Sequence, residues 1–219
     1  MSGDAFAEVA AARSRTYWLL SELFLVAPDG TGCDALATQL ETCEAGADAA
    51  WADLVVGLRR ALGEARPEDL QREHTRLLGG VGPDYGPPPP YESVHRGEAT
   101  VAGEATARAC RAYAEAGFGA IHPEAGPQDH IGVELRFMAL AAIAERDAWC
   151  AGDRDRARAL LARQLAFVRD HLVAWVPGYC ALIGGESRIA FYARLAALTE
   201  RVVIDDHALV ADLLAEVSA

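Results

Sequence analysis

Residues 6–24, FAEVAAARSRTYWLLSELF, decide the class of fold. Their apolar side chains fall at steps of three and four positions, at Phe6, Val9, Ala10, Tyr17, Leu20 and Phe24. Because an α-helix turns once in about 3.6 residues, this spacing places them on one face of a helix. The breaker cluster Pro-Asp-Gly at residues 28–30 ends the pattern, so we predict one amphipathic helix that buries this face.

The same helical spacing recurs through most of the chain. We predict further helices over residues 34–43, 48–62, 67–78, 102–117, 128–150, 153–176, 187–202 and 206–217. Pro177 and Gly178 should close the seventh of these nine predicted helices, and Asp205 should cap the last. No segment has a convincing strand pattern. We therefore predict an all-α fold, a single globular bundle of about eight or nine helices over residues 1–219.

One segment breaks the helical pattern. Residues 79–90 read GGVGPDYGPPPP, and four successive prolines lack N–H donors and fix φ. We predict a Pro/Gly-rich hinge loop over residues 79–93, with the prolines extended as polyproline II. Such a hinge makes domain swapping conceivable, so both a monomer and a swapped dimer remain open.

Charge and composition exclude several classes of protein. The chain has 20 basic residues, all arginine, against 32 acidic ones, which gives a net charge of −12. That balance argues against nucleic acid and anionic membranes as partners. The longest apolar run, residues 137–144, is far short of the roughly 20 residues of a membrane span, and the acidic N-terminus is no secretory signal. We therefore expect a soluble, cytoplasmic protein without membrane insertion.

Chemical motifs are sparse. The five cysteines form no CxxC pair, and there is no phosphate loop, GxSxG elbow or HExxH motif. His130 and Glu134 lie four positions apart beside Asp129 and could be half of a metal site. A structural hydrogen bond or an exposed helix pair explains the same spacing. We predict no catalytic residue, no metal and no cofactor, which is typical of a helical binding protein.

Two central blocks of the sequence have a distinctive pattern. The first is Leu77-Leu78-Gly79-Gly80 followed by PPPPYESVH at residues 87–95, and the second is PQDHIGVELRFM at residues 127–138. Together they resemble the TorD/DmsD family, cytoplasmic chaperones dedicated to molybdenum enzymes. Weaker similarity at residues 17–24, 167–177 and 191–196 follows the family's order. Leu78 stands where the family commonly has Phe, and His95 where it has Tyr; we expect both near the binding surface.

The resemblance implies a non-enzymatic, system-specific chaperone. It would bind the apo catalytic subunit of a DMSO-reductase-type molybdoenzyme, together with its twin-arginine leader peptide, and assist molybdenum cofactor insertion before export. The implied client- and leader-binding residues are Leu77, Leu78, Tyr91, Glu92, Ser93, Asp129, His130 and Glu134. Asp129 could pair with a leader arginine. For each of these residues a structural role, such as capping a helix or packing in the core, is the alternative.

Other functions stay open at this point. The chain could be a nitrate-reductase-type assembly factor whose client lacks an exported leader. The glycines before the proline run allow a small nucleotide- or ligand-binding protein. An enzyme would have to use Asp129, His130 and Glu134 as its acid and base.

Overall fold

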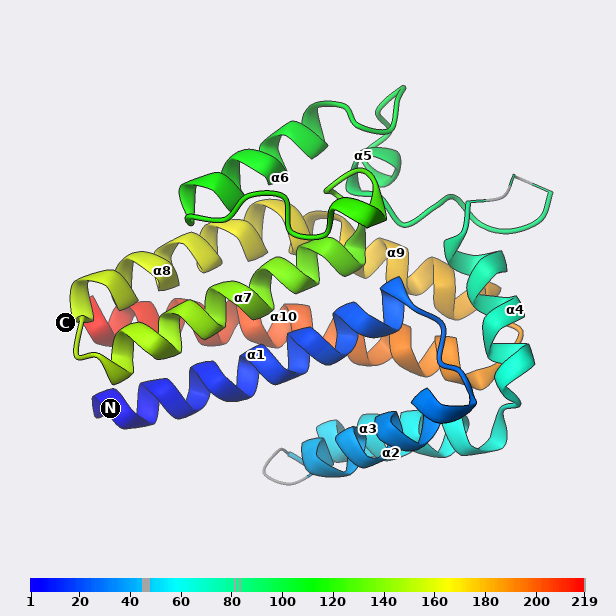
Figure 1. Ribbon diagram of the computed structural model, residues 1–219, viewed down its shortest axis with the longest axis horizontal. Coiled ribbons are helices and arrows are strands. Elements are labelled where there is room, and N and C mark those ends of the chain that lie inside the picture. The colour runs from blue at the N-terminus through cyan, green and yellow to red at the C-terminus, as the bar shows by residue number, and fades with distance from the viewer. Residues whose placement is uncertain (45–47, 81, 83, 219) are drawn as a thin grey trace.

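The protein is described by a computed structural model that covers residues 1–44, 48–80, 82 and 84–218 (Figure 1). Its α-helices are α1 (Gly3–Leu25), α2 (Gly30–Glu44), α3 (Ala49–Glu64), α4 (Pro67–Leu78), α5 (Glu92–His95), α6 (Glu104–Glu115), α7 (Ile131–Cys150), α8 (Arg154–Phe167), α9 (Val173–Glu186) and α10 (Ala190–Ser218). A 3₁₀ turn, η1 (Pro123–Ala125), precedes α7, and a π-helical turn, η2 (Val168–Leu172), joins α8 to α9. No β-strand occurs in these ranges, so the predicted all-α bundle is confirmed.

The long helices form the body of the bundle. Figure 1 shows α1, α7, α8 and α10 running alongside one another, with α2 and α3 below and α6 above. Helices α1 and α7 approach closely at Gly132, whose carbonyl accepts a 2.6 Å hydrogen bond from the Ser21 hydroxyl. A Cβ atom at residue 132 would lie 2.6 Å from Cγ of Leu25, so a glycine is required for this approach.

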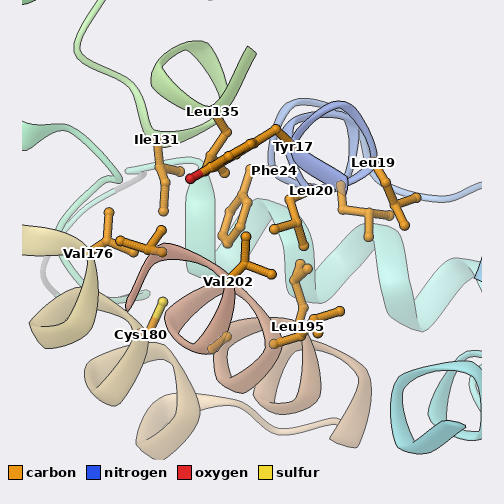
Figure 2. Packing of buried hydrophobic residues seen from close by; sticks show 14 of the residues in the cluster. Tyr17, Leu19, Leu20, Phe24, Ile131, Leu135, Val176, Cys180, Leu195 and Val202 are labelled. Atoms are coloured by element: carbon orange, nitrogen blue, oxygen red, sulfur yellow. The ribbon is translucent and has the colours of Figure 1, made fainter. Parts of the chain in front are cut away.

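The face predicted for α1 is the one that the core buries. Figure 2 shows side chains of α1 meeting those of α7, α9 and α10, among them Tyr17, Leu20, Phe24, Ile131, Leu135, Val176, Cys180, Leu195 and Val202. A second cluster forms at the other end of α1, where the Phe6 ring stacks on Trp149 with their centroids 4.6 Å apart. Within the described residues, no helix is both long and apolar enough to span a membrane.

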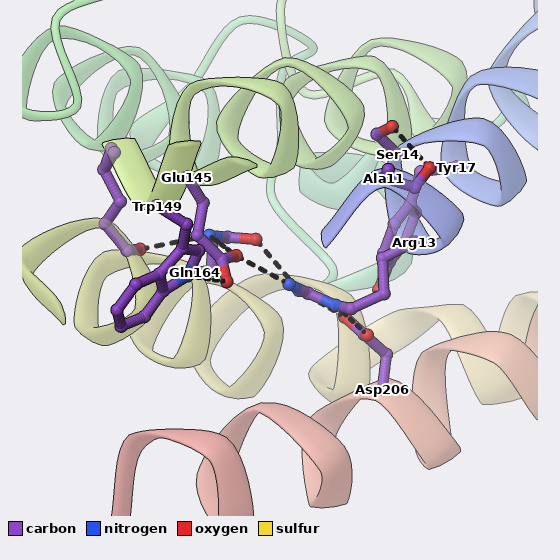
Figure 3. Close-up of polar contacts among 9 residues, drawn as sticks. Ala11, Arg13, Ser14, Tyr17, Glu145, Trp149, Gln164 and Asp206 are labelled. Carbon is purple, nitrogen blue, oxygen red and sulfur yellow. Dashed lines mark hydrogen bonds and ion pairs between the residues drawn. The ribbon is translucent and has the colours of Figure 1, made fainter. Parts of the chain in front are cut away.

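A buried ionic network ties four helices together (Figure 3). Arg13 of α1 donates to Asp206 of α10 at 2.6 Å, to Glu145 of α7 at 2.9 Å and to Gln164 of α8 at 2.9 Å. Tyr17 adds a 2.8 Å bond to the Asp206 carboxylate. The two carboxylates compensate the buried charge of Arg13. Because one cation faces two anions, the neutral donors Tyr17, Trp149 and Gln164 complete the hydrogen bonds of the carboxylates.

The C-terminal helices differ from the prediction. Instead of two helices over 187–202 and 206–217, α10 is continuous, and Asp205 is not an N-cap but pairs with Arg201 inside the helix. The reason is that the buried stripe runs on through Val202, Val203 and Val210 without a glycine or proline to interrupt it.

Pro177 and Gly178 do not end their helix either. They lie inside α9, which continues to Glu186. A proline inside a helix costs about 3 kcal/mol, but α9 buries Trp175, Tyr179 and other large apolar side chains, and this packing offsets the cost. Helix α2 likewise begins earlier than predicted, at Gly30, since the Asp29 carboxylate accepts the Gly32 N–H at 2.6 Å.

The predicted Pro/Gly-rich loop connects α4 to α5. Residues 84–90 form turns and irregular chain without a helix, as four successive prolines require. The last two positions of the predicted loop, 92 and 93, belong to α5 instead. Positions 81 and 83 lie outside the described residues, and the role of this loop as a hinge stays a prediction.

Candidate functional site

The two sequence blocks that carry the family resemblance meet in the structure. Tyr91 and His130 form an isolated antiparallel bridge. The Glu92 N–H donates to the Asp129 carbonyl at 2.9 Å, and the Ile131 N–H donates to the Pro90 carbonyl at 2.9 Å. The Tyr91 and His130 rings meet edge to face, with their centroids 5.2 Å apart. We call residues 90–93 together with 129–131 the block junction.

Asp129 holds the block junction together from the inside. Its side chain is completely buried. One carboxylate oxygen accepts the Ser93 N–H at 3.0 Å, and the other accepts the Thr106 hydroxyl at 2.6 Å. Asp129 therefore caps the short helix α5 and anchors α6, and the carboxylate does not face an approaching arginine.

His130 is the N-cap of α7. Its Nδ1 accepts the Gly132 N–H at 3.1 Å. Burial lowers the pKa of His130 to about 4, so the ring is neutral near pH 7. A neutral imidazole that caps a helix through one nitrogen serves poorly as an acid–base catalyst. The suggested enzyme set of Asp129, His130 and Glu134 is thus engaged in structural bonds.

Glu134 lies in a different cluster, below the block junction. Glu92 of α5, Glu134 of α7 and His171 of η2 offer ligand atoms within 4.8 Å of one another, and all three side chains are buried. Nδ1 of His171 lies 2.7 Å from a Glu92 oxygen. The Trp175 indole N–H donates to Glu134 at 3.0 Å.

A proton on Glu134 explains this cluster. Burial, and then the charge of Glu92, raise the pKa of Glu134 well above its ordinary value of 4.5. Two carboxylates and an imidazole are a ligand set that divalent metals accept. Here, however, the Arg96 guanidinium lies 2.7 Å from Glu92 and Arg108 lies 3.8 Å away. These cations compensate the charge of Glu92, and a protonated Glu134 adds no further charge to the cluster.

The remaining predicted residues lie mostly inside the protein. Leu77 and Leu78 are buried in the core, and Ser93 is also buried, whereas Tyr91 is half-buried. His95, expected near the binding surface, is half-buried; it stacks on Trp175 and lies 3.1 Å from the Pro89 carbonyl oxygen. Of these residues, His95 is the one that contacts the proline run directly.

The open surface lies beside these residues, in a groove lined largely by the predicted Pro/Gly-rich loop. This proline-loop groove has a volume of about 600 Å³. Its lining includes Arg76, Tyr85, Pro87, Pro88, Pro89 and Leu182. Tyr85 is 46% exposed. Gly86 is required here, since a Cβ atom would lie 1.8 Å from the Arg76 carbonyl oxygen. In the sequence, the tyrosine within the Pro/Gly-rich loop was the feature that could have indicated this groove.

Comparison with known proteins agrees with these features. The family described as nitrate reductase delta subunit matches residues 44–181. The chaperone protein TorD of Photobacterium profundum is 32% identical over 104 residues, which are 47% of this chain and 47% of that protein. The match thus spans about half the length of this curated relative. The chain therefore belongs to the nitrate reductase delta subunit family, and its TorD-like resemblance is confirmed.

Proposed function

We propose that this protein is a non-enzymatic, cytoplasmic chaperone for one molybdoenzyme system. It binds the apo catalytic subunit of a DMSO-reductase-type enzyme, together with its twin-arginine leader, and assists molybdenum cofactor insertion before export. One observation carries the proposal: the two TorD-like blocks form a single folded unit directly beside an open groove. The similarity to a protein named as a chaperone supports it.

The proline-loop groove suits a peptide. The proline run forms a wall that is already fixed, so little conformational entropy is lost when a peptide binds against it. Tyr85 and Leu182 supply apolar surface. The carboxylates of Asp84 and Glu186 also line the groove, together with Arg188 and with Arg76, whose charge is paired with Glu73. An apolar segment flanked by arginines, such as a twin-arginine leader, matches this combination.

The block junction holds the wall of the groove in position. The Pro90 carbonyl accepts a hydrogen bond from the N–H of Ile131, the first residue of α7, and the Pro89 carbonyl accepts the Tyr91 N–H at 2.9 Å. His95 packs under the same prolines. In this proposal the block residues act as positioning residues, and the side chains of the groove contact the client.

Affinity purification tests the function. The tagged chain is expressed in its own host under anaerobic growth, and its partners are identified by mass spectrometry. We expect a molybdoenzyme large subunit with its leader uncleaved and its cofactor absent. Recovery of no molybdoenzyme subunit would contradict the function itself.

Variants then test the surface. Replacing Tyr85 and Leu182 together by serine should reduce client capture about tenfold or more, because central apolar contacts dominate binding. Leu209→Ser is the control, since Leu209 is 39% exposed on α10, away from the groove. Equal capture by the groove variant and the control would place the client elsewhere on the protein.

The matched family favours a second candidate, an assembly factor for a nitrate-reductase-type client that lacks an exported leader. Fluorescence anisotropy with an isolated leader peptide distinguishes the two. Saturable binding of the leader supports the first candidate. Binding of the apo subunit without its leader, and no binding of the leader alone, supports the second.

A further inference from the structure

A second groove lies between α6 and α8, which Figure 1 shows next to each other on one side of the bundle. It has a volume of about 300 Å³. We call it the α6–α8 groove; its lining includes Arg108, Arg111, Arg163, Phe167, Asp170 and His171. It shares no lining residue with the proline-loop groove.

The concentration of positive charge in this groove is unusual for an acidic protein. The whole chain carries a net charge of −12, yet three of its 20 basic residues line this one small groove. Arg108 is already paired with Glu104 at 3.5 Å and lies 3.8 Å from Glu92. Arg111 and Arg163 are exposed and form no ion pair with any described residue. Two carboxylates, Glu115 and Asp170, also line the groove, but Asp170 is already paired with Arg169 at 2.7 Å. The groove therefore has guanidinium groups left to bind an anion.

Defined contacts hold the floor of the groove in place. The π-helical turn η2 carries His171, and single π-helical turns inside helices are frequent at functional sites. The His171 ring stacks on Phe167, with centroids 4.5 Å apart and planes 16° apart. Its Nδ1 is held by Glu92 at 2.7 Å. His171 in the floor is thus held in place by Phe167 and Glu92, while the two unpaired arginines are exposed to solvent.

We propose that the α6–α8 groove binds a phosphate-bearing small molecule. A guanidinium presents a planar fork of N–H donors that matches two phosphate oxygens, and arginine is for this reason the preferred residue for phosphate recognition. A volume of about 300 Å³ is at the lower end of small-ligand sites and suits one or two phosphoryl groups with a small attached moiety. The site is independent of the client groove, and its test does not depend on the client.

The test uses pyrophosphate as the probe. Isothermal titration calorimetry of the full-length chain at constant ionic strength measures its affinity. We expect one saturable site. Arg111→Gln with Arg163→Gln should weaken binding at least about tenfold, because two charge-assisted contacts are lost. Arg15→Gln with Arg60→Gln makes the same change in net charge at exposed positions on α1 and α3 and should leave binding unchanged.

Three results would overturn the proposal. The first is no saturable binding of pyrophosphate by the wild-type protein. The second is an equal loss in both double variants, which would indicate a general charge effect. The third is binding of a glutamate-rich peptide of the same charge where pyrophosphate fails, because the groove would then recognise an acidic protein segment. Circular dichroism of both variants checks that the helices are intact.

Discussion

Glu134→Gln should remove a pH dependence from the stability of this protein. In the folded state Glu134 is fully buried, accepts the Trp175 indole N–H at 3.0 Å and lies close to Glu92. A glutamine has nearly the same shape. Its carbonyl can accept from Trp175, so this hydrogen bond survives without a titratable proton.

The magnitude follows from the proton. Burial, and then the charge of Glu92, hold the pKa of folded Glu134 well above the ordinary value of 4.5 that applies to the unfolded chain. At a pH between these two pKa values, Glu134 is protonated in the folded state and ionised in the unfolded chain. The contribution of this proton to the free energy of unfolding is therefore complete below pH 4.5 and is lost as pH rises toward the pKa of the folded state. The free energy of unfolding therefore falls by up to about 1.4 kcal/mol per pH unit. Over two pH units the variant should gain up to about 2.7 kcal/mol relative to the wild type.

Urea denaturation of both proteins at pH 5, 6 and 7, followed by circular dichroism, measures this difference. Other groups titrate alike in both proteins and largely cancel when the free energies are subtracted. Glu8→Gln, which changes an exposed carboxylate of α1, is the control and should give a difference that is independent of pH. A constant difference for Glu134→Gln as well would refute the protonation of Glu134 and mean that its carboxyl group is ionised in the folded protein.

Three further substitutions test the framework by urea denaturation. Arg13→Ala should cost about 3–5 kcal/mol, since it leaves two buried carboxylates without their cation; a loss below about 1 kcal/mol would contradict the network. Thr106→Val should cost about 1–3 kcal/mol by removing the hydroxyl that donates to Asp129, while Thr106→Ser should be close to wild type; equal losses would exclude that bond. Gly86→Ala should cost about 1–3 kcal/mol and reduce client capture, whereas Gly119→Ala, with open space around it, should do neither.

The sequence predicted the helical body well because a buried helix face appears as apolar residues spaced three and four positions apart. The stripe that includes Tyr17, Leu20 and Phe24 is buried as its spacing required. The errors came where tertiary contacts decide. Pro177 is a local signal for a helix end, but the packing of α9 against its neighbours overrides it. The ion pair of Arg13 with Asp206 joins residues 193 positions apart, and no local pattern contains it.

The candidate site shows a different limit. The sequence alone does not distinguish a buried carboxylate that caps a neighbouring helix from an exposed carboxylate that can pair with an arginine of a partner protein. Asp129 is the first kind, since both of its oxygens are occupied. Exposed Tyr85 lies outside the family-like blocks, yet it lines the open groove. We therefore expect substitutions in the two blocks to lower the stability of the fold, whereas substitutions at Tyr85 and Leu182 should change which client the protein binds.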